Sequence, residues 1–154
     1  MNKIKPEIWV DAAACPLKDV ILQEAEQKQI TVIFVSSYNH YLSLSHPLAR
    51  VIFVDASYQS VDMYIINGVK AGDLIITDDY GLACLALGKG CLALGTRGKG
   101  YTGDNISFLL MNRHISRQTA KAGKRLKGLR PLTTNEVECF RQNLRKLLCN
   151  EEGI

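Results

Sequence analysis

Three aspartates stand directly after apolar runs, and a fourth lies between those runs. Asp11 ends one run, while Asp78 and Asp79 follow another in the sequence Ile-Ile-Thr-Asp-Asp. Asp62 lies in the segment expected to form the intervening helix, from which it could project toward the same edge. Because clustered carboxylates repel one another, such a group costs stability unless a cation holds it. Held around Mg²⁺ or Mn²⁺, these carboxylates could orient and activate a water for attack on a phosphodiester.

The same aspartates have a simpler interpretation as helix caps. An aspartate before the first turn of a helix accepts hydrogen bonds from backbone N–H groups that have no partner within the helix. Asp79 in particular is placed to cap a helix that begins at Tyr80. The chemistry of the residues by itself favours neither the metal site nor the caps.

The elements that must position these carboxylates alternate along residues 8–95. Continuous apolar runs predict five strands at 8–11, 31–36, 50–54, 74–77 and 91–94. Apolar residues at helical spacing predict helices after Pro16 and over 57–67 and 80–87. Continuous apolar strands are typical of parallel strands buried on both faces, so the alternation predicts an α/β layered sheet. Open parallel sheets bind ligands beyond the carboxyl ends of their strands, so the carboxylates share one crevice if their strands are neighbours.

Two helices are predicted in the remainder of the chain. Thr102 can cap a helix from Gly103 to about Arg117. The run Thr133-Thr134-Asn135-Glu136 has the form of a capping box and opens a last helix over about 134–149. No linker is evident, so we expect residues 1–154 to form a single domain.

Positive charge is concentrated in the second half of the chain. Residues 1–95 carry a net charge of −3 and residues 96–154 a net charge of +7. The segment 113–130 contains no acidic residue and seven basic ones: Arg113, Arg117, Lys121, Lys124, Arg125, Lys127 and Arg130. With Arg97 and Lys99 of a glycine-containing loop, it is interpreted as a phosphate-contacting arm for nucleic acid, the alternative being a solvated surface. The segment has no Phe, Tyr or Trp, so base stacking is not predicted there.

Composition and cysteine usage favour a cytoplasmic globular protein. The chain has 154 residues, 47% of them hydrophobic, and no apolar run of the roughly 20 residues needed to cross a bilayer. The first residues do not have the pattern of a signal peptide. The five cysteines include no Cys-x-x-Cys pair, and four of them are expected to be reduced thiols in the core. Cys15 stands at a helix start, where the helix dipole should lower its pKa, although we favour a packing role for it.

Several motifs together resemble the YaiI/YqxD family over about residues 8–148. These are Val-Asp-Ala-Ala-Ala-Cys-Pro at 10–16, Gly-Asp-Leu-Ile-Ile-Thr-Asp-Asp at 72–79, Leu-Ala at 82–83, Lys-Gly at 89–90, Arg-Gly at 97–98, Tyr-Thr at 101–102 and Asn-Ile at 105–106. The family is similar in pattern to PIN-like nuclease domains, which implies an α/β/α sandwich with a mainly parallel sheet and an acidic metal site. The resemblance implies Asp11, Asp62 and Asp79 as site carboxylates, with Asp78 and Asp104 as further candidate ligands.

The chain departs from the family pattern at the candidate site. Ala13 stands where the family usually has an aspartate, and Gln59 stands where it tends to have another acid. The segment 128–131 reads Gly-Leu-Arg-Pro where Gly-Gly-Pro is often found. Fewer carboxylates imply weaker metal binding.

The acidic motifs and the family resemblance together give the leading hypothesis, a ribonuclease-type phosphodiesterase dependent on Mg²⁺ or Mn²⁺. The alternatives are a non-catalytic nucleic-acid-binding module and a small-molecule phosphohydrolase.

Overall fold

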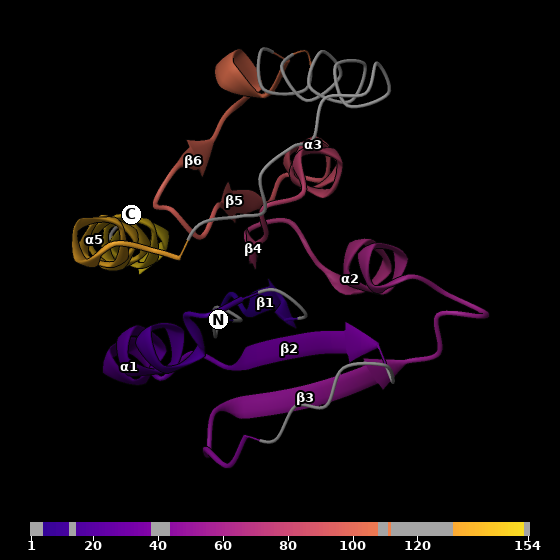
Figure 1. The fold of residues 1–154 in the computed structure, drawn as a ribbon, viewed down its shortest axis with the longest axis horizontal. Helices are drawn as coiled ribbons and strands as arrows, with labels where there is room; N and C mark the ends of the chain where they lie inside the picture. The colour runs from indigo at the N-terminus through magenta and orange to yellow at the C-terminus, as the bar shows by residue number, and fades with distance from the viewer. Residues whose placement is uncertain (1–4, 13–14, 38–43, 108–110, 112–130, 153–154) are drawn as a thin grey trace.

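The computed structural model describes residues 5–12, 15–37, 44–107, 111 and 131–152. Within these residues, six strands form one sheet in the order β3-β2-β1-β4-β5-β6, with β1 and β4 at its centre (Figure 1). The strands are β1 (Ile8–Asp11), β2 (Val32–Ser37), β3 (Ala49–Val54), β4 (Leu74–Ile76), β5 (Leu92–Leu94) and β6 (Gly100–Tyr101). All neighbouring pairs are parallel except β5 with β6, so the expected mainly parallel α/β architecture is confirmed.

The helices are α1 (Lys18–Lys28), α2 (Val61–Gly68), α3 (Tyr80–Gly88) and α5 (Thr134–Glu152). Residues 103–107 are also helical, as expected, and the rest of that predicted helix lies mostly outside the described residues. The segment 57–60, expected in a helix, lies outside α2: residues 56–58 form a turn, and the N–H groups of Tyr58 and Gln59 donate to the backbone oxygen of Asp55. Helix α2 starts only at Val61 because the hydroxyl of Ser60 accepts from the Met63 N–H and caps it.

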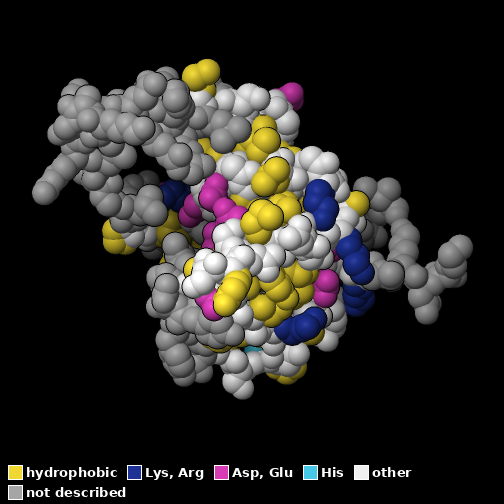
Figure 2. All heavy atoms as spheres, turned by 90° about the vertical axis from the view of Figure 1, so that its right-hand side faces the viewer, with side chains coloured by type: hydrophobic (Ala, Val, Ile, Leu, Met, Phe, Trp, Pro, Cys, Tyr) yellow, Lys and Arg dark blue, Asp and Glu magenta, His cyan; other side chains and the backbone are white. Residues whose placement is uncertain are grey.

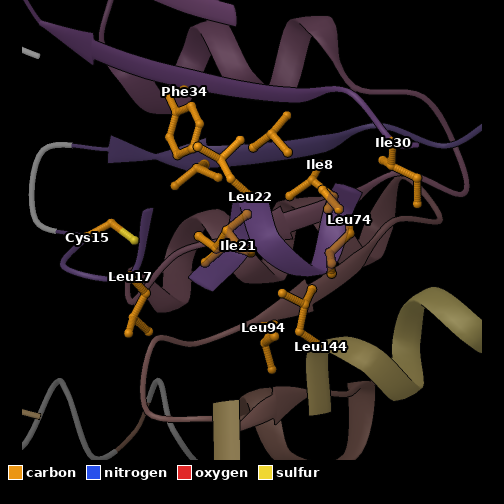
Figure 3. Packing of buried hydrophobic residues seen from close by; sticks show 14 of the residues in the cluster. Ile8, Cys15, Leu17, Ile21, Leu22, Ile30, Phe34, Leu74, Leu94 and Leu144 are labelled. Carbon is orange, nitrogen blue, oxygen red and sulfur yellow. The ribbon is translucent and has the colours of Figure 1, made fainter. Parts of the chain in front are cut away.

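Alternate strand residues face two different hydrophobic layers, which gives the α/β/α sandwich. Val10 and Phe34 face one layer, where α1 and α5 contribute Ile21 and Leu144 to the core (Figure 3). Trp9 and the other alternate residues face the second layer, where α2 and α3 supply Ile65, Val69, Leu82, Ala83 and Ala86. The strand sequences are continuously apolar because both faces of every central strand are buried.

A buried ion pair joins the two helices of the first layer. Glu24 of α1 is only 5% exposed, and its carboxylate accepts hydrogen bonds from Arg145 at 2.8 and 3.0 Å and from Arg141 at 3.2 Å. These hydrogen bonds, that from Arg145 above all, lower the pKa of Glu24 although burial opposes the effect. A buried carboxylate is tolerated there because two guanidinium groups of α5 replace its hydration.

Among the described residues, no helix is long and apolar enough to span a membrane.

Glu24→Gln should destabilise the protein at neutral pH by about 2 kcal/mol, since it removes the charge from these hydrogen bonds. Because the pKa of Glu24 is lowered in the folded state, its stabilisation is complete above the ordinary glutamate pKa. It is lost as the pH falls through the folded-state pKa. Urea unfolding from pH 7 to pH 3 should therefore show the difference from wild type shrinking below about pH 4. Glu26→Gln, on the exposed face of the same helix, is the control. If the difference in unfolding free energy between Glu24→Gln and wild type stayed the same at low pH, the ion-pair account would be contradicted.

Gly68→Ala should destabilise the protein by about 1–3 kcal/mol, since a Cβ there would lie 2.5 Å from Cη2 of Trp9. The indole of Trp9 is buried in the layer that contains α2, so the added methyl group forces a shift in the core. Gly88→Ala at the end of α3 is the matched control, because a Cβ there meets nothing within 4 Å. Thermal unfolding of both variants should separate them, and equal melting temperatures would contradict the close packing of α2 on Trp9.

Candidate acidic site at the carboxyl edge of the sheet

The pairing of β1 with β4 brings the two acidic motifs together. The register joins Ile8 with Leu74 and Val10 with Ile76, so Asp11 and Thr77 follow at the same level. The chain leaves β1 toward β2 and β3 on one side, and continues through β4 and β5 on the other. The carboxyl ends of β1 and β4 thus form the switch point at which open parallel sheets bind ligands. Strands β1 and β4 are neighbours, as the shared crevice predicted from the sequence requires.

Thr77 links the two motifs through its hydroxyl. The residue is 2% exposed, and its Oγ1 donates to Oδ2 of Asp11 at 3.4 Å. The same oxygen accepts from the backbone N–H of Asp79 at 3.0 Å. One buried hydroxyl therefore links the carboxylate at the end of β1 to the backbone at the start of α3.

Asp79 caps α3, which confirms the simpler interpretation of this residue. Its Oδ1 accepts from the N–H groups of Gly81 at 2.8 Å and Leu82 at 3.3 Å. Both of these hydrogen bonds use one carboxylate oxygen, so the cap and a ligand role are chemically compatible. A metal-binding role for Asp79 remains a prediction.

Asp78 ties the site to the loop after β5. Its Oδ1 accepts from the N–H of Thr96 at 2.8 Å, and its Oδ2 accepts from the hydroxyl of Thr96 at 2.6 Å. Tyr101 of β6 lies close by, with its ring edge against Tyr80 at a centroid distance of 5.8 Å. Burial raises the pKa of Tyr101, and the negative charge of Asp78 acts in the same direction, so its hydroxyl stays protonated.

The other predicted carboxylates are placed less centrally. Asp62 lies half-buried in the first turn of α2, and Asp104 is exposed in the helical residues 103–107. Within the described part of the chain, no three His, Cys, Asp or Glu side chains are grouped closely enough to hold a metal ion. Ligand roles for Asp11, Asp62, Asp78, Asp79 and Asp104 stay predictions.

The predicted phosphate-binding residues divide into three groups. Arg97 donates to Glu136 at 2.9 Å, and Glu136 also forms the predicted capping box with Thr133. Arg97 therefore anchors the loop after β5 to the start of α5, and phosphate contact by it remains a prediction. Lys99 is exposed. The seven basic residues of the segment 113–130 lie outside the described residues.

Cys15 differs from its sequence-based prediction. Burial raises the pKa of its thiol, and the charges of Asp78 and Asp11 add to this effect, whereas the N–H of Leu17 and the charge of Lys18 oppose it. The expected lowering by a helix dipole is wrong because the residue is buried beside carboxylates and α1 begins only at Lys18. The core prediction for the other four cysteines holds for Cys91, while Cys84, Cys139 and Cys149 are exposed.

Sequence reasoning missed three residues that organise the site. Thr77, Thr96 and Tyr101 carry the hydroxyl groups beside the acidic motifs. A signal was present only for Thr77, since a polar residue at the end of the apolar run 74–76 marks the carboxyl end of a buried strand. Thr96 lies in the loop after β5 and Tyr101 in β6, and a strand of two residues is too short to be recognised from the sequence.

These features define an α/β protein with Asp11, Asp78 and Asp79 at the switch point of a mainly parallel sheet. The model of the uncharacterized BCR, YaiI/YqxD family matches residues 9–150, and the chain belongs to this family.

The chain is also similar to curated proteins and to a solved structure. A UPF0178 protein of Bacillus cereus (strain Q1) is 46% identical over 136 residues, which are 88% of this chain and 93% of that protein. A UPF0178 protein of Bacillus anthracis (strain A0248) is 43% identical over 143 residues, which are 92% and 98% of the two chains. The crystal structure of Rae1 (YacP) from Bacillus subtilis, a tryptophan-to-leucine variant, gives a TM-score of 0.43 at 18% identity. It covers 94% of this chain and 98% of that one, and at this distance the likeness assigns no function.

Thr77→Val should destabilise the protein by about 1–3 kcal/mol, because it removes the acceptor of the hydrogen bond from the Asp79 N–H and a donor to Asp11. Thr77→Ser keeps the hydroxyl and should stay within about 1 kcal/mol of wild type. Denaturant unfolding of both variants gives the comparison. If valine were tolerated as well as serine, Thr77 would not link the two motifs.

Proposed function

We propose that the protein is a divalent-metal-dependent phosphodiesterase that acts on RNA, with Asp11, Asp62 and Asp79 as its site carboxylates. The observation that carries this proposal is the shared Thr77 hydroxyl, which donates to the Asp11 carboxylate and accepts from the Asp79 N–H at the switch point of the sheet. Sheets of this kind bind ligands at that place, and carboxylates that converge there would repel one another without a cation.

The donor set fits a hard cation. Mg²⁺ and Mn²⁺ prefer oxygen ligands, and Mg²⁺ sites commonly use one or two carboxylates together with waters and substrate phosphates. Asp11 and Asp79 supply such carboxylates, and Asp62 would be a third. When bound, the cation would activate a water and neutralise charge on a phosphodiester.

The remaining residues have supporting roles in this proposal. Thr77 fixes the orientation of Asp11, and the protonated hydroxyl of Tyr101 is a hydrogen-bond donor beside Asp78. Lys99, Arg97 and the basic segment 113–130 would neutralise phosphates along a nucleic acid strand. A cytoplasmic location belongs to the same proposal, because three exposed cysteines remain free thiols.

A non-catalytic RNA-binding module is the second candidate. Ala13 and Gln59 replace acids of the family pattern, which leaves fewer possible ligands for a cation. The basic segment would bind RNA in either case, so binding alone does not separate the two functions. The response to Mn²⁺ and the cleavage of RNA do separate them.

Asp11→Asn should weaken the stabilisation of the protein by Mn²⁺. A ligand at 100 times its Kd stabilises the folded state by about 2.7 kcal/mol, which for a chain of this size corresponds to a rise of about 5–10 °C in Tm. The variant should lose most of this rise and, since one repelling charge is gone, should be no less stable than wild type without metal. Cleavage of single-stranded RNA in Mn²⁺ should fall by about 100-fold or more, with RNA binding preserved.

Glu26→Gln, an exposed charge change on α1, is the control and should keep both the Mn²⁺ response and cleavage. If wild type binds RNA but neither responds to Mn²⁺ nor cleaves, the phosphodiesterase proposal is wrong and the binding module stands. If wild type does not bind RNA, both candidates fail.

A further inference from the structure

Tyr58 is a large side chain left almost completely in solvent. It is 90% exposed, more than Met63, Leu85 or Met111, the other large hydrophobic residues exposed in the described part of the chain. Tyrosine offers a flat ring with few rotatable bonds, so it can make a large contact at low entropic cost. Such a ring is available for stacking without any rearrangement of the core.

The loop that carries Tyr58 is held in place. The N–H groups of Tyr58 and Gln59 donate to the backbone oxygen of Asp55 at 2.9 and 3.0 Å, and the N–H of Ser57 donates to its Oδ1 at 2.9 Å. Ser60 then caps α2. The backbone is therefore fixed on both sides of the exposed ring, which makes the ring a preorganised contact.

The loop lies at the same edge of the sheet as the acidic site. Strand β3 runs parallel to β2, and β2 to β1, so the residues after Val54 leave at the carboxyl edge (Figure 1). Figure 2 shows this side of the molecule, where acidic side chains gather next to exposed hydrophobic ones. Helix α2, which begins just after the loop, contacts both β1 and α3. Tyr58 thus precedes α2, the helix whose first turn contains Asp62.

The spacing suits a single strand of nucleic acid. The end of β3 is two strand spacings from β1, or about 10 Å. One strand of a duplex advances about 3.4 Å per nucleotide along the axis, and at that spacing about three nucleotides cover the span. Single-strand binding combines cations along the backbone with aromatic rings for the bases. The basic segment 113–130 has no such ring, whereas Tyr58 is a ring with no role in the core.

We propose that Tyr58 stacks on a base of a single-stranded nucleic acid whose backbone crosses the acidic site, and that it selects unpaired strands. This inference rests on the proposed function for the identity of the ligand, but not on cleavage. A duplex keeps its bases stacked on one another, so it cannot offer a base to Tyr58 without unpairing.

The test compares Tyr58→Ala and Tyr58→Phe in binding to a 12-residue single-stranded oligoadenylate, measured by fluorescence anisotropy. Loss of one stacked base should weaken binding about 10-fold in Tyr58→Ala, whereas Tyr58→Phe should bind like wild type. The salt dependence should keep its slope because no charge is lost. Binding to double-stranded RNA and to an abasic strand of equal length should be unchanged. Leu85→Ala, an exposed apolar residue on α3, is the matched control.

The outcomes separate this inference from the proposed function. If Tyr58→Ala binds the oligoadenylate like wild type while wild type cleaves RNA in Mn²⁺, the stacking inference is wrong and the phosphodiesterase stands. If Tyr58→Ala weakens binding but wild type cleaves no RNA in Mn²⁺, the stacking inference stands and the phosphodiesterase proposal is wrong. Equal losses in Tyr58→Ala and Tyr58→Phe, equal losses on the abasic strand, or no binding of oligoadenylate by wild type would each overturn stacking.

Discussion

The parallel pairing of β1 with β4 is the constraint on which the rest of the structure depends. It joins segments 66 residues apart, and it places Asp11 level with Thr77. Both strands are buried on two faces, so sliding one by a single residue would move each of its side chains into the opposite hydrophobic layer, among different packing partners. The hydrophobic core therefore sets the register, and the register sets which polar groups meet at the carboxyl edge.

Hydrogen bonds at that edge then convert neighbouring strands into a site of definite geometry. The Thr77 hydroxyl, the cap formed by Asp79 and the pair of bonds between Asp78 and Thr96 each satisfy a polar group close to the sheet. These bonds join residues at or just after the ends of β1, β4 and β5 to one another and to the first turn of α3, so the positions of the strands decide the geometry of this edge.

Helix α5 packs in the same layer as α1 and also contacts the loop after β5, next to the site. Its arginines neutralise Glu24 of α1, and Asn143 donates to the backbone oxygen of Gly98. Gly98 has a positive φ of 93°, and a Cβ there would lie 2.7 Å from Cys139 of α5, so only glycine allows this approach. Together with the Arg97–Glu136 pair, these contacts hold the loop that carries Thr96. The last helix thus contributes to the site without supplying a side chain to it.

The sequence by itself determined the elements whose causes are local. The alternation of apolar strands and helices, the cap at Asp79 and the capping box of Thr133 and Glu136 all depend on residues within a few positions of one another. It also identified the YaiI/YqxD family, since the motifs are continuous stretches of chain. The tertiary structure decided that Thr77 joins Asp11 to Asp79, that Arg97 pairs with Glu136, that β6 extends the sheet and that the pKa of Cys15 is raised. Each of these depends on burial or on contacts between distant segments, and a local pattern does not contain that information, because packing of the whole chain selects the neighbours.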